Sequence, residues 1–165
     1  MGHWPATLCR DKLACAYPYH DKERNIISID GGLEVKYDGQ LNLLIFENCD
    51  STDYTVIYSD GLETVKVSEH QDASDDPIHI RFGHNNIELL EKGEEFSTCR
   101  YGEHVFDIPN TYIYEEHGQH KSWDYSHYEL PVEIGDELSV IMRTSRGLIA
   151  KKDGCTGWYH GKIIE

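Results

Sequence analysis

The hydrophobic pattern of this chain is that of short β-strands. Over residues 129–141, apolar side chains recur at every second position: Leu130, Val132, Ile134, Leu138 and Val140. A period of two places successive side chains on opposite faces of a strand. The Gly135-Asp136 pair between the two runs is typical of a tight turn. The segment therefore predicts strand, turn and strand.

Runs of the same kind fill most of the remaining chain. We expect strands at 12–19, 26–29, 33–37, 41–46, 54–58, 62–67, 78–82, 87–90, 104–108, 111–115, 128–134, 137–142, 147–150 and 157–164. Only 88–97 could form a turn or two of helix, and Gly93 in its middle disfavours it. The pattern predicts an all-β fold, a small barrel or β-sandwich of short antiparallel strands, with helix in less than roughly 15% of residues.

Composition and charge narrow the class of partner. The 165 residues are 39% hydrophobic, which is enough for one self-sufficient β-rich domain over 1–165. A net charge of −15 would repel a nucleic-acid backbone or an anionic membrane, so a neutral or basic protein partner is expected. No stretch approaches the ~20 apolar residues that a membrane helix needs.

The cysteines favour a reducing compartment. There are five, an odd number, without a C-x-x-C spacing, and segment 1–18 lacks the features of a signal peptide. We therefore expect reduced cysteines and a cytoplasmic location. A mature secreted chain could instead form up to two disulfides, and whether Cys9 pairs with Cys15 stays open.

Two groups of residues carry side chains that metals prefer. They are Asp72, Asp75 and Asp76, and the set His117, His120 and His127 with Asp124 between them. The acidic group lacks the alternating ligands of a calcium loop, and the histidine spacing is not that of a known zinc site. We expect solvated side chains, no structural metal and no cofactor.

Catalytic motifs are missing as well. The chain has no G-x-S-x-G, no phosphate-binding G-x-x-x-x-G-K-[ST] and no G-x-G-x-x-G string. With acidic residues so numerous, a pair of carboxylates carries no information. We therefore expect no catalytic residues and a protein that is not an enzyme.

The aromatic residues are more specific. Three strings are of the kind that lines grooves for proline-rich ligands: Tyr17-Pro18-Tyr19, 108–112 and Gly157-Trp158-Tyr159. A polyproline helix is preformed and stacks on rigid aromatic faces. Acidic side chains beside such a groove, here Asp21 and Glu23, would select a basic residue. The alternative is that these aromatics belong to an ordinary core.

Trp158 and Tyr159 are adjacent and should lie on opposite faces of one strand, one packing inward and the other offered outward. We expect Trp158 to be partly exposed in a protein-binding groove. A Trp158→Ala variant would then stay folded and lose its partner.

The two ends of the chain resemble a known family. ELPVEIGDELSVI at 129–141, followed by GWYHGK, resembles the middle of a Src-homology-3 domain. Met1-x-x-Trp4, Thr7 and Lys12, followed by Ala16-Tyr17-Pro18-Tyr19-His20-Asp21, are similar to the start of the Dock (dedicator of cytokinesis) exchange factors. The resemblance covers about 1–21 and 129–161.

The resemblance implies a small barrel built from 1–21 and 129–165, with 22–128 as a β-rich insertion where the family has a short loop. The chain departs from the family in one motif, because Pro109-x-x-Tyr112 precedes Trp158 instead of following it. If 1–21 pairs with the C-terminal strands, the barrel is supported. If 22–128 forms one sandwich with those strands, it is not.

The resemblance also implies a function. The chain would be a non-catalytic interaction module that binds a proline-rich or helical segment of an Elmo-type partner. It would be the regulatory N-terminal region of an exchange factor for Rho-family GTPases. The implied ligand surface is Tyr17, Tyr19 and Trp158, with Glu129 and Asp136 on the acidic side that sets specificity.

A second hypothesis is a stand-alone ligand-binding β-sandwich, lectin-like or immunity-protein-like. Aromatic faces stack on sugar rings while carboxylates accept hydrogen bonds from hydroxyls. The residues suited to this role are Trp4, Trp123, Asp124 and Tyr125.

Overall fold

The computed structural model describes residues 4–83 and 86–164, so Met1 of the N-terminal motif lies outside the described residues. Strand accounts for 51% of the chain and helix for 4%, which confirms the all-β prediction and the limit on helix. The short antiparallel strands form several sheets and close no barrel among the described residues. The helical segments there are η1 (Ala6–Cys9) and η2 (Asn110–Tyr112). None of the described helices is long and apolar enough to cross a membrane.

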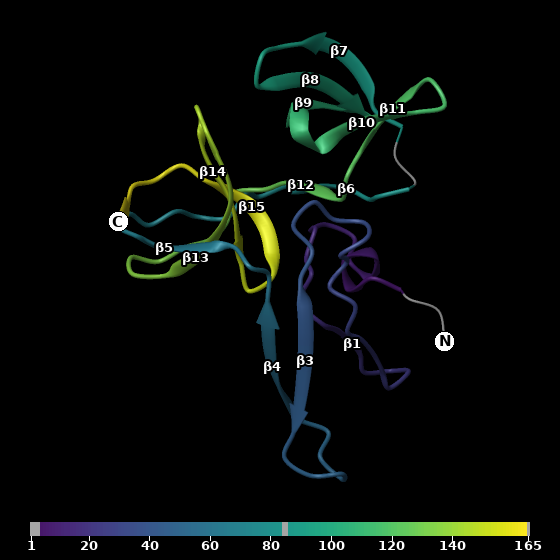
Figure 1. Cartoon of the computed structure of the whole chain (residues 1–165), viewed down its shortest axis with the longest axis vertical. Coiled ribbons are helices and arrows are strands. Elements are labelled where there is room, and N and C mark those ends of the chain that lie inside the picture. Colours follow the sequence, from purple (N-terminus) through teal and green to yellow (C-terminus); the bar gives the residue numbers. More distant parts are fainter. Residues whose placement is uncertain (1–3, 84–85, 165) are drawn as a thin grey trace.

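The largest sheet among the described residues has five antiparallel strands and lies on the left in Figure 1; we call it the central sheet because a hydrophobic core lies on each of its faces. Its order is β15-β14-β13-β5-β16, with β5 (Glu63–Val67), β13 (Glu137–Thr144), β14 (Gly147–Lys152), β15 (Cys155–Tyr159) and β16 (Ile163–Ile164). β13 to β15 form a meander, and β5 joins it from the middle of the chain. The Gly135-Asp136 corner is present: Gly135 has φ 93° and donates its N–H to Val67 O at 2.9 Å. Positive φ is a conformation that glycine adopts without strain.

The predicted strand at 128–134 is wrong as a regular strand. It makes only isolated bridges, from Glu129 to Trp158 and from Val132 to Gln71. The predicted alternation holds at Leu130 and Val132, which are buried, but Ile134 is 69% exposed. The segment is therefore an extended loop, and its side chains Leu130 and Val132 reach the core without continuous strand pairing.

Hydrophobic cores cover both faces of the central sheet. Trp158 belongs to one core, with Phe96, Ile108 and Ile149, whereas Tyr159 belongs to the other, which includes Leu138. The two aromatics do lie on opposite faces, but Trp158 is only 5% exposed and Tyr159 is fully buried. The expectation that Trp158 is partly exposed is wrong. Residues from the middle of the chain pack on the face of β15 that carries Trp158, whereas the sequence pattern predicted that this face is exposed.

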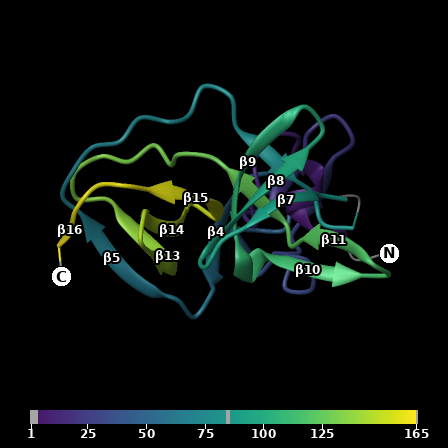
Figure 2. The same cartoon turned by 90° about the horizontal axis from the view of Figure 1, so that it is seen from above.

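The segments that cover the Trp158 face of the central sheet form three small sheets, which we call the covering layer; Figure 2 shows the molecule from above. They are the meander β7 (Glu88–Lys92), β8 (Phe96–Tyr101) and β9 (His104–Pro109), the hairpin β10 (Ile113–Glu116) and β11 (Gln119–Ser122), and the pair β6 (Ile78–Ile80) and β12 (Tyr125–His127). The possible helical turns at 88–97 do not form, because this segment makes β7 and the start of β8, and β7 overlaps the strand expected at 87–90. Gly93 lies at the turn between them and donates its N–H to Phe96 O at 2.9 Å. An added Cβ there would meet that same oxygen.

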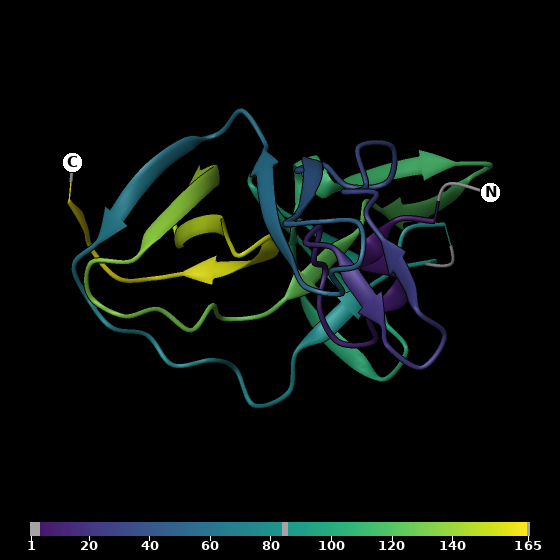
Figure 3. The ribbon, with the colours of Figure 1, turned by 90° about the horizontal axis from the view of Figure 1, so that it is seen from below.

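The remaining strands form two hairpins, β1 (Tyr19–Asp21) with β2 (Ile26–Ser28) and β3 (Leu41–Phe46) with β4 (Tyr54–Ser59). The β3–β4 hairpin projects from the body in Figure 1, and Figure 3 shows it from below beside the N-terminal segment. The prediction for 41–46 is confirmed residue for residue. The predicted strand at 33–37 is wrong: this segment is a turn in which Lys36 N–H donates to Gly32 O at 2.8 Å.

The N-terminal segment lies against β15. Ala16 N–H donates to Gly154 O at 2.8 Å, and Thr156 N–H donates to Ala14 O at 2.9 Å. Cys15 and Cys155 form a disulfide at the same place, so the expectation of reduced cysteines is wrong for this pair. The two ends that carry the family resemblance therefore lie side by side, while the middle of the chain also packs on the C-terminal strands.

Removing the disulfide should destabilise the protein. Cys15 and Cys155 are 140 residues apart, and a cross-link that closes so long a loop restricts the unfolded chain. We expect the double variant Cys15→Ala/Cys155→Ala to lose about 2–4 kcal/mol of unfolding free energy in urea titrations without reductant. The control is Cys49→Ala, which removes an exposed free thiol. Thiol titration of the denatured, unreduced chain should detect only Cys9, Cys49 and Cys99. Five reactive thiols would contradict the pairing.

Candidate functional site

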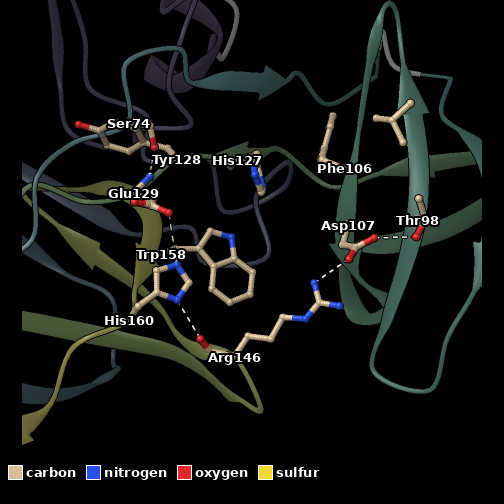
Figure 4. Close-up of a pocket in the computed structure, with 11 residues that line it drawn as sticks. Ser74, Thr98, Phe106, Asp107, His127, Tyr128, Glu129, Arg146, Trp158 and His160 are labelled. Carbon is tan, nitrogen blue, oxygen red and sulfur yellow. Dashed lines mark hydrogen bonds and ion pairs between the residues drawn. The ribbon is translucent and has the colours of Figure 1, made fainter.

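A cavity of about 430 Å³ opens between β15 and the β8–β9 hairpin (Figure 4). We call it the Trp158 cavity. Its walls are Ser74, Thr98, Val105, Phe106, Asp107, His127, Tyr128, Glu129, Arg146, Trp158 and His160. They come from strands β8, β9, β12 and β15 and from four connecting segments, so residues far apart in the sequence meet here.

Trp158 is fixed on all sides. Its Nε1–H donates to the Tyr125 hydroxyl at 2.8 Å, and its ring lies 5.8 Å from the Phe96 ring between centroids. The imidazole of His160 stacks on it, with centroids 5.6 Å apart and planes 6° apart. Its backbone N–H donates to Tyr128 O at 2.7 Å. The indole is therefore a rigid wall of the cavity and at the same time part of the core beneath it.

One side of the cavity carries a paired acid and base. The Arg146 guanidinium lies 2.6 Å from Asp107 Oδ2, and the Thr98 hydroxyl donates to Asp107 Oδ1 at 2.7 Å. These two hydrogen bonds, with that from Thr98 the stronger influence, hold the pKa of Asp107 below its usual range. Arg146 also lies 4.3 Å over the centre of the Phe96 ring. The negative charge of Asp107 is thus balanced by Arg146, and the ion pair fixes Arg146 in place.

The opposite side is acidic and more open. Glu129 is half exposed, and its Oε1 lies 3.6 Å from Nε2 of His160. Nδ1 of His160 lies 2.8 Å from Arg146 O. His127 stacks near Phe106, with centroids 5.2 Å apart, and burial lowers the pKa of its imidazole. Glu129 is therefore a carboxylate of this cavity without a lysine or arginine partner among the described residues. The whole arrangement offers aromatic faces beside one available negative charge.

The five residues that the sequence proposed as a site do not all lie in this cavity. Glu129 and Trp158 meet in the cavity, but Tyr17, Tyr19 and Asp136 do not line it. Tyr17 packs edge-on against Tyr58 at 6.5 Å, and Tyr19 lies beneath the guanidinium of Arg10 at 5.6 Å.

Asp136 accepts hydrogen bonds from two residues outside the cavity. It accepts a hydrogen bond from Lys152 Nζ and another from Glu133 N–H at 2.9 Å. These contacts, that from Lys152 first, lower the pKa of Asp136. Asp21 likewise pairs with Arg24, at 2.7 Å. Both carboxylates therefore have local structural roles.

Sequence reasoning missed Phe106, Arg146 and His160. His160 could have been found, because a residue two positions after Trp158 projects from the same face of an extended chain. Phe106 and Arg146 could not, since only the folding of the β8–β9 hairpin and the β13–β14 turn over β15 brings them to the indole.

The metal candidates lie apart from one another. Asp124 is buried and His127 lines the cavity, whereas His117 is at the β10–β11 turn and His120 is opposite Glu115 on β11. Within the described residues, no three or more His, Cys, Asp or Glu side chains are grouped so as to hold a metal ion.

The residues suited to a sugar site are also divided. Trp4 is 60% exposed, but Asp124 and Tyr125 are fully buried. Trp123 stacks on Phe82, with centroids 5.3 Å apart and planes 10° apart. Two of the four side chains therefore cannot touch a surface ligand in this structure.

Beneath the N-terminal segment lies a buried polar network that ties it to the central sheet. Its members with fully buried side chains are Lys36, Asp38, His79, Asp124 and Lys151. Asp124 accepts from the Thr7 hydroxyl at 2.5 Å, lies 2.9 Å from His79 Nε2 and 3.7 Å from Lys36 Nζ. Asp38 accepts from the Thr156 hydroxyl at 2.5 Å and lies 3.2 Å from Lys36 Nζ.

Lys151 completes the network. It donates to Asp38 O at 2.6 Å and lies 3.4 Å from Asp60 Oδ2. Burial lowers the pKa of Lys151, while the charges of Asp38 and Asp60 oppose the shift. The buried charges of both signs are thus paired, as burial of a charge requires.

No family model, no curated protein and no solved structure matches this chain.

Proposed function

We propose that this chain is a non-catalytic protein-interaction module that holds a proline-rich or helical segment of a partner in the Trp158 cavity. The observation that carries the proposal is that Trp158 and Glu129 line one cavity. The exposed imidazoles of His127 and His160 offer ring faces on which a preformed polyproline ridge or an apolar helix face stacks, and Trp158 lies against the ring of His160. Glu129 lies at the edge, where it would pair with a lysine or arginine of that segment.

The apolar rim supports the same reading. Val105 on β9 is 53% exposed at the cavity, which leaves an aliphatic side chain available for contact. A ligand that covers Val105 and the neighbouring aromatic faces would remove apolar surface from water. Of the five residues proposed from the sequence, Glu129 and Trp158 are the two that line this cavity, and we propose that they contribute to ligand binding.

The family resemblance supports a regulatory role. We propose that the module is the N-terminal region of an exchange factor for Rho-family GTPases. The pairing of residues 14–16 with β15 brings the two similar ends together, while β5, from residues 22–128, pairs with β13 in the same sheet. Tyr17 and Tyr19 would then support the β3–β4 hairpin and the N-terminal segment instead of the ligand.

Reversing the charge at Glu129 should weaken ligand binding. We expect Glu129→Lys to bind an arginine-containing proline-rich peptide, of the form R-x-x-P-x-x-P, about tenfold less tightly than the wild type, because a charge-assisted contact becomes repulsive. Val105→Asp should have an effect of similar size through the apolar rim. The measurement is fluorescence anisotropy with the labelled proline-rich peptide.

The matched control is Glu115→Lys, which reverses an exposed carboxylate on β10 outside the cavity. Thermal unfolding checks that each variant is folded. The proposal fails if the proline-rich peptide does not bind the wild type, or if Glu129→Lys and Val105→Asp bind it as the wild type does.

A further inference from the structure

The β3–β4 hairpin exposes an apolar face that the fold does not use. Leu43 lies opposite Ile57 in the antiparallel register, and Leu41 and Ile45 are two positions away on the same face. Their exposures are 64% for Leu41, 56% for Leu43, 46% for Ile45 and 52% for Ile57. We call these four residues the open hairpin face. A two-stranded hairpin is marginally stable in water unless something packs on it, so such a face is unusual on a free surface.

The other face of the hairpin is held by the body of the protein. The Tyr58 ring packs against Tyr17, and the Tyr54 ring lies 5.9 Å from His20. At the base, the Asn42 amide donates to Ala16 O at 2.8 Å and to Ile29 O at 2.9 Å. These contacts hold the hairpin against the body of the protein, so the open hairpin face is directed outward.

The apolar surface continues at the base of the hairpin. A cavity of about 370 Å³ there is lined in part by Ile29, Leu33 and Leu41. Leu33 is 59% exposed and Ile29 is 41% exposed. The open hairpin face and this cavity therefore form one strip that leads from the hairpin to the N-terminal segment.

The strip is surrounded by negative charge. Residues 41–60 contain no lysine or arginine, and they contain Glu47, Asp50, Asp53 and Asp60. Apart from Asp60, none of these carboxylates forms an ion pair with a described residue, and the same is true of Glu34 beside the basal cavity. A second copy of this chain would bring a like-charged hairpin, and an anionic membrane would be repelled. The surface therefore fits a basic partner.

We propose that the open hairpin face docks an amphipathic helix of a partner protein, with lysine or arginine flanking its apolar stripe. Leu41 to Ile45 covers four strand rises, roughly 13 Å. That length matches two to three turns of helix, and the width of a two-stranded ribbon matches a single apolar stripe. The basic side chains on either side of the stripe lie near Glu34, Glu47 and Asp53. This surface is separate from the Trp158 cavity.

The test uses a labelled helical peptide of about 18 residues, built from leucine on one face and lysine on the other. One control peptide has the same composition in scrambled order, and another has glutamate in place of lysine. The test variant is Leu43→Thr with Ile57→Thr, because threonine keeps a strong strand preference while removing apolar surface. We expect at least a tenfold loss of affinity for this variant, weaker binding of the wild type at higher salt, and at least tenfold weaker binding of both control peptides.

Val105→Asp, which changes the Trp158 cavity, should bind the helical peptide as the wild type does. Loss of binding in that variant alone would place the peptide in the cavity and overturn the inference, while leaving the proposed function standing. Equal binding of the scrambled peptide would also overturn it. So would sedimentation that shows a wild-type dimer dissociated by the double variant, since the occupant would then be a second copy.

Discussion

Replacing Asp124 with alanine should lower the free energy of unfolding by about 3–5 kcal/mol. The carboxylate has no exposed surface, and it accepts the Thr7 hydroxyl, faces His79 and lies 3.7 Å from Lys36 Nζ. Alanine leaves the buried charge of Lys36 with one partner fewer and the Thr7 hydroxyl without an acceptor. Uncompensated buried charge and an unsatisfied donor are among the most costly consequences of a single substitution.

Urea denaturation at neutral pH measures this effect. Asp50→Ala is the matched control, because Asp50 is exposed near the tip of the β3–β4 hairpin and should change stability by no more than about 0.5 kcal/mol. A loss at Asp124 no larger than that at Asp50 would show that the network does not hold the N-terminal segment.

The same variant has a pH signature. Burial alone would raise the pKa of Asp124, but the hydrogen bond from His79 and the charge of Lys36 outweigh it and lower that pKa. A carboxyl whose pKa is lower in the folded state contributes stability above its unfolded pKa of about 3.9, and this contribution is lost as the pH falls through the folded value. The stability difference between wild type and Asp124→Ala should thus be constant above about pH 5 and shrink below about pH 4.

Replacing Trp158 with alanine should also cost about 3–5 kcal/mol. The indole is 5% exposed, contacts Phe96 and His160, and donates to the Tyr125 hydroxyl at 2.8 Å. Truncation would leave a large void in the core and a buried hydroxyl without its donor. The sequence-based prediction that this variant stays folded and loses only its partner is therefore replaced.

Thermal or urea unfolding of Trp158→Ala and Trp158→Phe tests the revised role. Phenylalanine retains aromatic contact with Phe96 and loses the hydrogen bond to Tyr125, so its loss should be clearly smaller than that of alanine. An alanine variant as stable as the wild type would show that Trp158 serves a ligand surface alone. Binding at the cavity is better measured with Glu129 and Val105, whose side chains are exposed and not part of the core.

The local pattern was sufficient for the class and for many elements. The period-two alternation predicted the observed bounds of β3 and came within two residues of the ends of β13 and β14. It succeeded because one face of each strand packs against a neighbouring element. At 88–97 the pattern left a strand at 87–90 and a turn or two of helix both open, since a short run with one apolar pair, Leu89-Leu90, fits either. There the packing of Phe96 in the core and the turn at Gly93 decide for strands.

The sequence by itself determined that this protein is made of short antiparallel strands with turns between them. It also proposed five binding residues, of which Glu129 and Trp158 line one cavity. Only the tertiary structure decided that Trp158 is buried, that Cys15 meets Cys155, and that Lys36, Asp38, Asp124 and Lys151 form one network. The physical reason is the range of the interactions. Alternation and turn chemistry act between residues close in sequence. The layer that covers β15, the disulfide and the pairing of buried charges join segments far apart in the chain, with 140 residues between Cys15 and Cys155 and 113 between Asp38 and Lys151.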